Sequence, residues 1–256
     1  MKIAVIGNTG NLGVIGSKVI ALLRAHGHEA ISPALPPHLD SHAASELVRT
    51  LRDTEVLVDT SWSGRATASD LATPLEHSLP SLLQRSEAGI GRRVALSVVG
   101  ADRHSGPLPR YLAARRHREE LVQEFGQPFT IVRATQCFEQ LVDIAESLRH
   151  GGEIRVPSVL AQPMAADDVS AELVAAALAP PLDRIVEVAG PETFRLDALL
   201  RRVVGREDTV VSDPRARYQG MKLDERALLP TRASCTFSIR FGVWKSSELS
   251  RLASLA

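Results

Sequence analysis

Residues 2–13 have the sequence KIAVIGNTGNLG, and this stretch decides which fold the whole chain is expected to take. The almost wholly apolar run Lys2–Ile6 predicts a buried β-strand. Beyond the glycines, Ile15, Val19 and Leu23 recur at helical spacing and predict an amphipathic helix. The chain therefore opens with a strand, a glycine-rich turn and a helix, the arrangement that holds a dinucleotide in open α/β folds.

The turn has the spacing G-x-x-G-x-x-G. The first glycine permits a tight exit from the strand, the second lets the backbone approach a pyrophosphate, and the third lets the helix pack closely on the sheet. Free N–H groups at the helix start then face the phosphates. The alternative is a glycine-rich turn that merely packs. The residues predicted to bind the cofactor here are Gly7, Asn8, Thr9, Gly10, Asn11, Leu12 and Gly13.

The rest of the chain alternates short apolar runs with longer segments at helical spacing, which is typical of a parallel sheet covered on both faces. Further strands are expected near residues 29–32, 55–59, 93–97 and 129–133, with helices near 41–52, 70–88, 108–125 and 138–150. The prediction is an α/β protein with a Rossmann-type doubly wound parallel sheet. One such domain spans residues 1–256, and residues from about 151 on contribute a small C-terminal substrate lobe.

Composition excludes several classes of function. The 256 residues carry no formal net charge, which argues against a nucleic-acid or anionic-membrane partner, because both need a basic surface. Two cysteines are too few for a disulfide scaffold, and the eight histidines show no metal-binding spacing. There is no secretion signal and no apolar run long enough to span a membrane. A cytoplasmic protein that binds a small molecule is expected, and a homodimer is compatible with the sequence.

The end of the second expected strand bears on the choice of cofactor. NAD-binding proteins usually carry an acidic residue there to hold the ribose 2′-hydroxyl, and none occurs between Ala30 and Leu39. No Arg or Lys is present there to hold a 2′-phosphate either. The missing acid favours NADP, with Ser32 as a hydrogen-bond donor to the phosphate. NAD stays open, as does the alternative that Ser32 merely starts a proline turn.

Polar residues follow the third expected strand, at the edge of the sheet where ligands bind in such folds. Asp59, Thr60 and Ser61 are predicted to contact the cofactor, and Trp62 to border the substrate. The alternative for Trp62 is that it simply covers the sheet edge.

Six segments of the chain form a recognisable series in their order and approximate spacing. They are GNTGNLG, ALSVVGADR (95–103), Tyr111 with the charged helix to Glu119, TIVRATQCFE (130–139), QPMAADDV (162–169) and VEVAGPE (186–192). In these segments the chain is similar to the atypical short-chain dehydrogenase/reductases of the NmrA-like, NAD(P)-binding type. This resemblance covers nearly the whole chain, and implies a Rossmann core, an NAD(P) cofactor and a smaller C-terminal substrate lobe. Members of the family include reductases, isomerases and redox-sensing regulators without chemistry.

The resemblance also implies a catalytic set of Ser, Tyr and a Lys four residues after the Tyr. Here Ser97 and Tyr111 match, and the lysine position holds Arg115. The tyrosine phenol would donate a proton to a carbonyl, the serine would orient that carbonyl, and the cation would lower the phenol pKa. A guanidinium keeps its charge but does not reproduce the compact bonds of an ammonium to a ribose. The alternatives are a solvated Arg115 and a Tyr111 that packs at the helix start.

Other residues carry less weight. Gln136 and Phe138 follow the fifth expected strand and are predicted to line the substrate pocket, although Phe138 could instead be core. Cys137 has no expected His–carboxylate neighbourhood, so a nucleophilic role is improbable. The segment 116–119 (RHRE) is predicted to form an exposed, charged helical face.

The sequence thus predicts an NADP-dependent oxidoreductase acting on a small or medium organic molecule. One alternative is an NADP-sensing regulatory protein without turnover, which the altered lysine position favours somewhat. Another is a cyclase, isomerase or dehydratase on the same fold.

Overall fold

The computed structural model describes residues 1–7, 13–33, 41–60, 90–102, 110–124, 126–205 and 209–253. Predictions on Asn8, Thr9, Gly10, Asn11, Leu12, Ser61 and Trp62, and on a helix near 70–88, lie outside the described residues. For Gly13 and Tyr111 the backbone is described but the side-chain environment is not.

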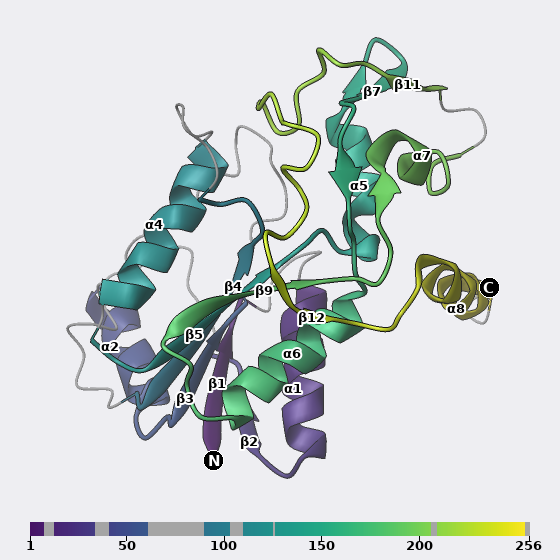
Figure 1. Ribbon diagram of the computed structural model, residues 1–256. Helices are drawn as coiled ribbons and strands as arrows, with labels where there is room; N and C mark the ends of the chain where they lie inside the picture. The colour runs from purple at the N-terminus through teal and green to yellow at the C-terminus, as the bar shows by residue number, and fades with distance from the viewer. Residues whose placement is uncertain are drawn as a thin grey trace. The chain divides into compact units, whose positions relative to one another are not determined.

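The main sheet has seven strands in the order β12-β9-β5-β4-β3-β1-β2 (Figure 1). The pairs β1–β2, β1–β3, β3–β4 and β9–β12 are all parallel. The predicted Rossmann-type α/β fold is therefore confirmed. The strands are β1 (Lys2–Ile6), β2 (Glu29–Ile31), β3 (Val56–Asp59), β4 (Arg92–Val98), β5 (Phe129–Ala134), β9 (Arg184–Ala189) and β12 (Ala233–Thr236).

Helices cover both faces of this sheet. Helices α1 (Gly13–Ala25) and α6 (Ala166–Leu178) lie on one face, and α2 (Ser41–Leu51) and α4 (Arg110–Glu124) on the other (Figure 1). The Ser170 hydroxyl of α6 donates to the Ile15 carbonyl of α1 at 3.5 Å. Leucines of α2 pack on β1 and β3 in one apolar cluster, comprising Ala4, Ile6, Leu47, Leu51, Leu57 and Ile90.

The strand order reverses between β1 and β3. The chain passes from β1 to its neighbour β2, then crosses to pair β3 with the other side of β1. Ile6 and Asp59 are register partners at the carboxyl ends of these strands. In open α/β folds a ligand binds at this reversal, outside the carboxyl ends of the strands. The residues that follow, Gly7 and Thr60, therefore mark the expected cofactor edge.

The chain forms two compact units. The first comprises residues 1–97, 110–133 and 169–186, and the second residues 98–109, 134–168 and 187–256. The second unit thus includes segments that precede residue 151. A substrate-binding role for a C-terminal lobe stays a prediction.

The second unit contains two small sheets, with the orders β11-β7-β6 and β10-β8. The prediction of a single helix near 138–150 is wrong in its C-terminal part. The segment forms a short 3-10 turn followed by a helix that ends at Ser147. The helix does not continue because Gly151 and Gly152 take positive φ (58° and 86°) and turn β6 back onto β7. The elements are η1 (Phe138–Gln140), α5 (Leu141–Ser147), β6 (Arg149–His150), β7 (Glu153–Val156), β8 (Leu160–Ala161), β10 (Phe194–Arg195), α7 (Leu196–Leu200), β11 (Thr209–Ser212) and α8 (Phe241–Ala253).

Aromatic rings form the core that holds α8. The ring centroid of Phe138 lies 5.5 Å from that of Phe241 and 5.3 Å from that of Trp244. The Arg202 guanidinium lies 4.7 Å from the Phe241 centroid, within cation–π range. Within the described part of the chain, no helix is both long and apolar enough to cross a membrane.

Candidate functional site

The expected cofactor edge is the carboxyl edge of the sheet, where β1 ends and Gly7 follows. Gly7 has a φ of 92°, a conformation that a side chain would strain, and the described helix α1 begins at Gly13. Thr60 ties β3 to this point, since its N–H and its hydroxyl both donate to the Ile6 carbonyl, at 2.9 and 2.8 Å. Gly16 is buried in the first turns of α1. A glycine with positive φ at the reversal point, followed six residues later by a helix N-terminus, fits a dinucleotide pyrophosphate.

Asp59 is tied to helix α4. Its carboxylate forms an ion pair with Arg118, and the two side chains are 17% and 16% exposed. Burial lowers the pKa of the neighbouring Arg93 guanidinium to about 10, and the Asp59 carboxylate opposes this shift. The predicted cofactor contact of Asp59 would therefore come from a carboxylate that already binds α4.

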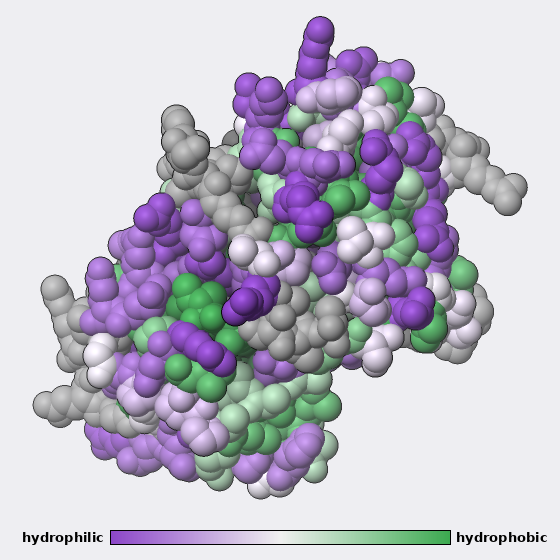
Figure 2. All heavy atoms as spheres, in the orientation of Figure 1, coloured by the Kyte–Doolittle hydropathy of each residue, from purple (hydrophilic) through white to green (hydrophobic). Residues whose placement is uncertain are grey.

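Helix α4 turns charged residues toward the sheet. Arg115 and Glu119 are each 4% exposed, and they share one helix face with the buried Leu112 and Val122. The prediction of an exposed face over 116–119 is therefore wrong in part, because Glu119 points inward and Arg118 is mostly covered. The outward face matches the prediction, and Figure 2 shows the surface over α4 as hydrophilic. On that face Arg116 pairs with Glu120 at 3.0 Å.

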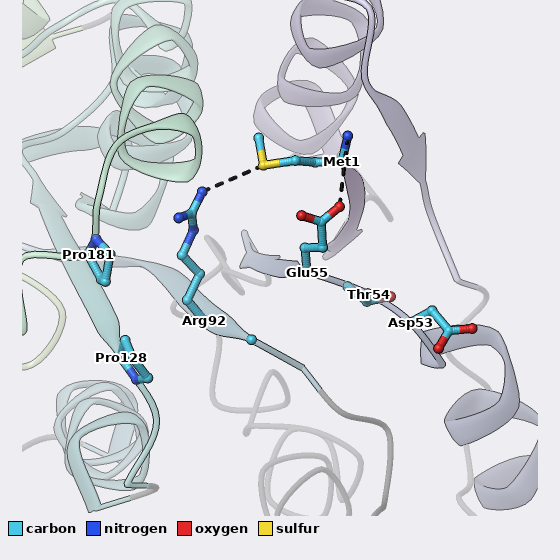
Figure 3. A pocket seen from close by; sticks show the side chains of 8 residues that line it. Met1, Asp53, Thr54, Glu55, Arg92, Pro128 and Pro181 are labelled. Carbon is cyan, nitrogen blue, oxygen red and sulfur yellow. Dashed lines mark hydrogen bonds and ion pairs between the residues drawn. The ribbon is translucent and has the colours of Figure 1, made fainter.

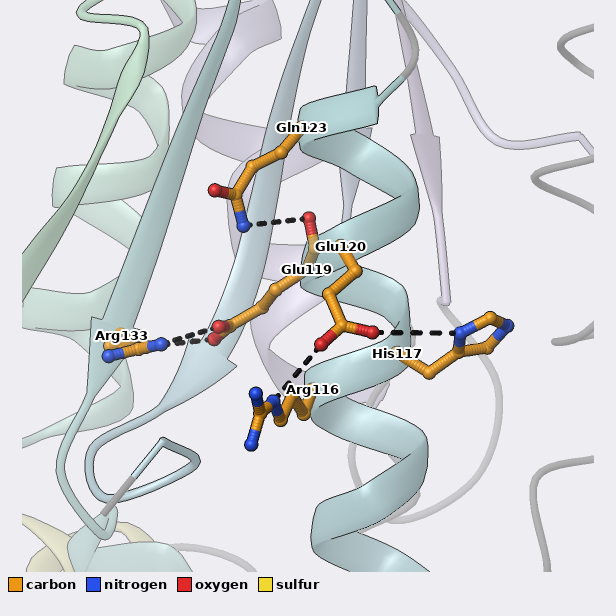
Figure 4. Close-up of polar contacts among 6 residues, drawn as sticks. All are labelled: Arg116, His117, Glu119, Glu120, Gln123 and Arg133. Atoms are coloured by element: carbon orange, nitrogen blue, oxygen red, sulfur yellow. Dashed lines mark hydrogen bonds and ion pairs between the residues drawn. The ribbon is translucent and has the colours of Figure 1, made fainter.

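The inward carboxylate has a buried partner on β5. Arg133 donates from Nε to Glu119 Oε1 at 2.9 Å and from Nη2 to Oε2 at 2.5 Å (Figure 4). The two side chains are 5–6% exposed. This bidentate geometry is the strongest form of such a pair. Sequence reasoning missed it because the two residues lie on different elements, and a charged helix suggested solvent.

Ser97 lies in the same layer as Arg115. Ala95 packs with Val122 of α4 in one apolar cluster, so the alternation of β4 also turns Ser97 toward α4. Ser97 lies two residues, about 6.6 Å, beyond Ala95 toward the carboxyl end. Arg115 lies seven residues, about 10.5 Å, before Val122 on a helix that runs back along the strands. Both residues thus lie on the carboxyl-edge side of the cluster that contains Ala95 and Val122.

The Ser97 hydroxyl is buried, and it has no hydrogen-bond partner among the described residues. A buried hydroxyl without a partner is costly and is typical of a group that serves a ligand. Tyr111 lies in the first turn of α4, one helical turn before Arg115. The structure therefore buries both Ser97 and Arg115 and places the Tyr111 backbone one turn before Arg115, and a joint catalytic role of the three stays a prediction.

Ser32 follows β2 and is exposed. The buried Pro33 comes directly after it, and the proline-rich segment that follows lies outside the described residues. An exposed hydroxyl at this strand end is open to a cofactor ribose or phosphate.

Two of the predicted substrate residues, Gln136 and Phe138, lie in the second unit. Gln136 has a buried side-chain oxygen without a hydrogen-bond partner among the described residues, so it retains capacity for a ligand. Phe138 is 1% exposed and belongs to the aromatic core around Phe241 and Trp244, which is the alternative that the sequence left open. Burial raises the pKa of the Cys137 thiol well above its usual range, which agrees with an unreactive cysteine.

A hollow also exists at the amino end of the sheet, lined in part by Met1, Thr54, Glu55 and Arg92 (Figure 3). Two of its charged side chains, Arg92 and Glu55, already have partners within the protein. Arg92 donates to the Ala177 carbonyl at 2.7 Å and to the Met1 sulfur at 3.8 Å, and Glu55 lies 3.9 Å from the N-terminal ammonium. Parallel sheets bind ligands at the opposite edge.

Several solved structures have a similar fold. UDP-glucose 4-epimerase from Thermotoga maritima, solved with UDP-glucose, has a TM-score of 0.59 and 16% identity over 88% of this chain and 90% of that chain. WbmG from Bordetella bronchiseptica, in complex with NAD and UDP, has a TM-score of 0.64 and 15% identity over 98% and 94%. A UDP-glucuronic acid 4-epimerase variant from Bacillus cereus, in complex with NAD and a fluorinated UDP-sugar, has a TM-score of 0.63 and 14% identity over 100% of both chains.

Identity this low shows the fold alone. The class defined here is a Rossmann-type fold shared with proteins that were solved with NAD. No family model matches the sequence, and no curated protein matches it.

Proposed function

We propose that this protein is an NAD(P)-dependent enzyme of the short-chain dehydrogenase/reductase class, of the NmrA-like type, acting on a carbonyl or alcohol of a small or medium organic molecule. One observation carries the proposal. Arg115, at the position where the class has its lysine, is buried on the inner side of α4, and the Ser97 hydroxyl is buried without a hydrogen-bond partner among the described residues. A solvated helix arginine, the alternative from sequence, would have been exposed.

The chain's own groups have separate roles in this proposal. A bound nicotinamide dinucleotide would supply hydride chemistry. Tyr111 would hold a proton at its phenol oxygen and donate it to the substrate oxygen, and the Ser97 hydroxyl would hydrogen-bond that same oxygen. The Arg115 guanidinium would lower the phenol pKa by proximity, since residues four apart share a helix face. The buried setting strengthens this electrostatic effect.

The NADP preference is a finer part of the proposal. It is supported by the lack of an acid from Ala30 to Leu39 and by the exposed Ser32 at the end of β2. The fold neighbours solved with NAD make NAD the alternative.

A second candidate is an isomerase in which hydride leaves and returns to one substrate without net oxidation. The similarity to UDP-sugar 4-epimerases favours it. Its substrate would be a nucleotide sugar, and the same tyrosine, serine and arginine would serve the proton transfer.

The test starts from the purified protein. Mass spectrometry of the denatured supernatant should find NADP(H) or NAD(H), and binding of added dinucleotide should be measurable by fluorescence. With dinucleotide deuterated at the nicotinamide C4, a panel of carbonyl compounds and nucleotide sugars is then incubated with protein. Deuterium in a reduced product supports the oxidoreductase, and epimerised sugar without net oxidation supports the isomerase. Dinucleotide binding without turnover across the panel would instead favour the regulator, and absence of binding would overturn the proposal.

A further inference from the structure

Two adjacent residues of α4 reach to strands on opposite sides of β4. Arg118 pairs with Asp59 of β3, and Glu119 pairs with Arg133 of β5. The sheet order β5-β4-β3 places β4 between these two strands. The pairs also have opposite polarity, because the helix supplies the cation to one side and the anion to the other.

This arrangement restrains the rotation of the helix. Consecutive residues of an α-helix diverge by about 100° around its axis, so neighbouring side chains reach partners on different sides. Turning α4 in either direction would lengthen one pair, and sliding it along the sheet would lengthen both. The Glu119–Arg133 pair is the stricter restraint, since it is bidentate and buried.

Arg115 lies about one turn before these anchors and is also buried. It precedes Arg118 by three residues and Glu119 by four, which are the spacings of helical neighbours. The height of Arg115 along the sheet thus depends on where the anchors hold α4. An arginine is longer and less compact than a lysine. The position of its charge therefore depends on how the contacts of Arg118 and Glu119 hold the helix.

We propose that Glu119 is a positioning residue: its buried pair with Arg133 fixes the rotation and height of α4, and with them the position of the buried Arg115 guanidinium one turn away. The proposal rests on the proposed function only in taking Tyr111, one turn before Arg115, as the proton donor. Glu119 itself touches neither substrate nor cofactor. It acts through the guanidinium, and loss of its charge loosens the placement of that group.

The test measures the ionisation of Tyr111, without substrate or cofactor. The chain has two tyrosines, so in a Tyr218→Phe background the absorbance of tyrosinate at 295 nm reports Tyr111 alone. We expect the Tyr111 pKa to lie below the ordinary value of about 10, and Glu119→Gln to raise it by about one unit. Glu120→Gln, on the exposed face of the same helix, is the matched control and should leave it unchanged. Circular dichroism at each pH confirms that the fold persists.

Two further variants keep the test decisive. Arg115→Met removes the positive charge altogether, so it should give the largest rise in the pKa of Tyr111. The double variant Glu119→Leu/Arg133→Met replaces the pair by apolar groups, which preserves folding while it removes the anchor, and should raise the Tyr111 pKa as Glu119→Gln does.

The outcomes separate the two proposals. If Arg115→Met raises the Tyr111 pKa while both Glu119 variants leave it unchanged, the positioning role is wrong and the proposed function stands. If Arg115→Met also leaves it unchanged, Arg115 does not act on Tyr111. In that case the role proposed for Arg115 and the positioning role of Glu119 are both overturned.

Discussion

Thr60 donates twice to one acceptor, the carbonyl oxygen of Ile6, from its N–H at 2.9 Å and its hydroxyl at 2.8 Å. The two residues belong to the strand ends on either side of the point where the strand order reverses. The hydroxyl is thus part of the link that holds the two strand ends together beside Gly7. Both residues are about 1% exposed, so water does not compete for these bonds.

We expect Thr60→Val to lower the free energy of unfolding by about 1 kcal/mol, the usual net value of one buried hydrogen bond. It should also weaken dinucleotide binding, because the exit of β1 loses one of its two ties to β3. Thr60→Ser keeps the hydroxyl and is the control. Urea denaturation and a dinucleotide titration provide both measurements. Equal dinucleotide affinity for Thr60→Val and Thr60→Ser would show that the tie does not shape the cofactor edge.

Gly7→Ala should cost both stability and cofactor affinity. A φ of 92° lies in the region that side chains rarely adopt, and we expect a loss of about 1–2 kcal/mol. Gly27→Ala is a matched control, because Gly27 also has positive φ (78°), a Cβ there would meet nothing within 4 Å, and it lies at the far end of α1. Both variants should lose similar stability in chemical denaturation. Only Gly7→Ala should raise the Kd for dinucleotide, and a similar rise for Gly27→Ala would mean that the effect is general.

Ser32→Asp should change the choice of cofactor. A carboxylate at the end of β2 would accept bonds from a ribose 2′-hydroxyl and repel a 2′-phosphate. We expect the ratio of the NADP to the NAD dissociation constant to rise at least about tenfold, which is about 1.4 kcal/mol. Isothermal titration with each dinucleotide measures this ratio, and Ser246→Asp on the exposed face of α8 is the control. An unchanged ratio would place the 2′ position of the ribose away from Ser32.

Asp168→Asn should stabilise the protein at neutral pH. Burial raises the pKa of the Asp168 carboxyl above its ordinary value of 3.8, and the nearby Asp167 charge adds to this shift. A raised folded-state pKa contributes stability below pH 3.8 that is lost as pH rises through the folded value, so the ionised carboxylate is a cost at pH 7. An asparagine oxygen can still accept the hydrogen bond from the Ile239 N–H.

The measurement is the melting temperature of both proteins between pH 7 and pH 4. The advantage of Asp168→Asn over the parent should be largest at pH 7 and should shrink toward pH 4, where the parent carboxyl gains its proton. Asp143→Asn on the exposed surface of α5 is the control. A difference that stays constant across this range would show that ionisation of Asp168 is not its cause.

Local patterns predicted the strand–turn–helix opening and most strands of the central sheet. The expected strand at 93–97 is observed at Arg92–Val98, and the one at 129–133 at Phe129–Ala134. These elements depend on apolar runs and on neighbours in the chain, which a sequence displays directly. Helix α8 was not predicted, because its helical faces are mixed and its position depends on rings contributed by Phe138 and Phe194.

The sequence by itself determined the Rossmann-type architecture, the glycine turn at the cofactor edge, and the presence of an arginine at the usual lysine position. Only the tertiary structure decided that Arg115 is buried, and that Glu119 faces Arg133 rather than solvent. The reason is physical. Backbone conformation follows from short-range sterics and periodic burial, whereas the environment of a charge depends on which distant strand lies opposite it. Asp59 and Arg118 are 59 positions apart in the chain, and only folding makes them partners.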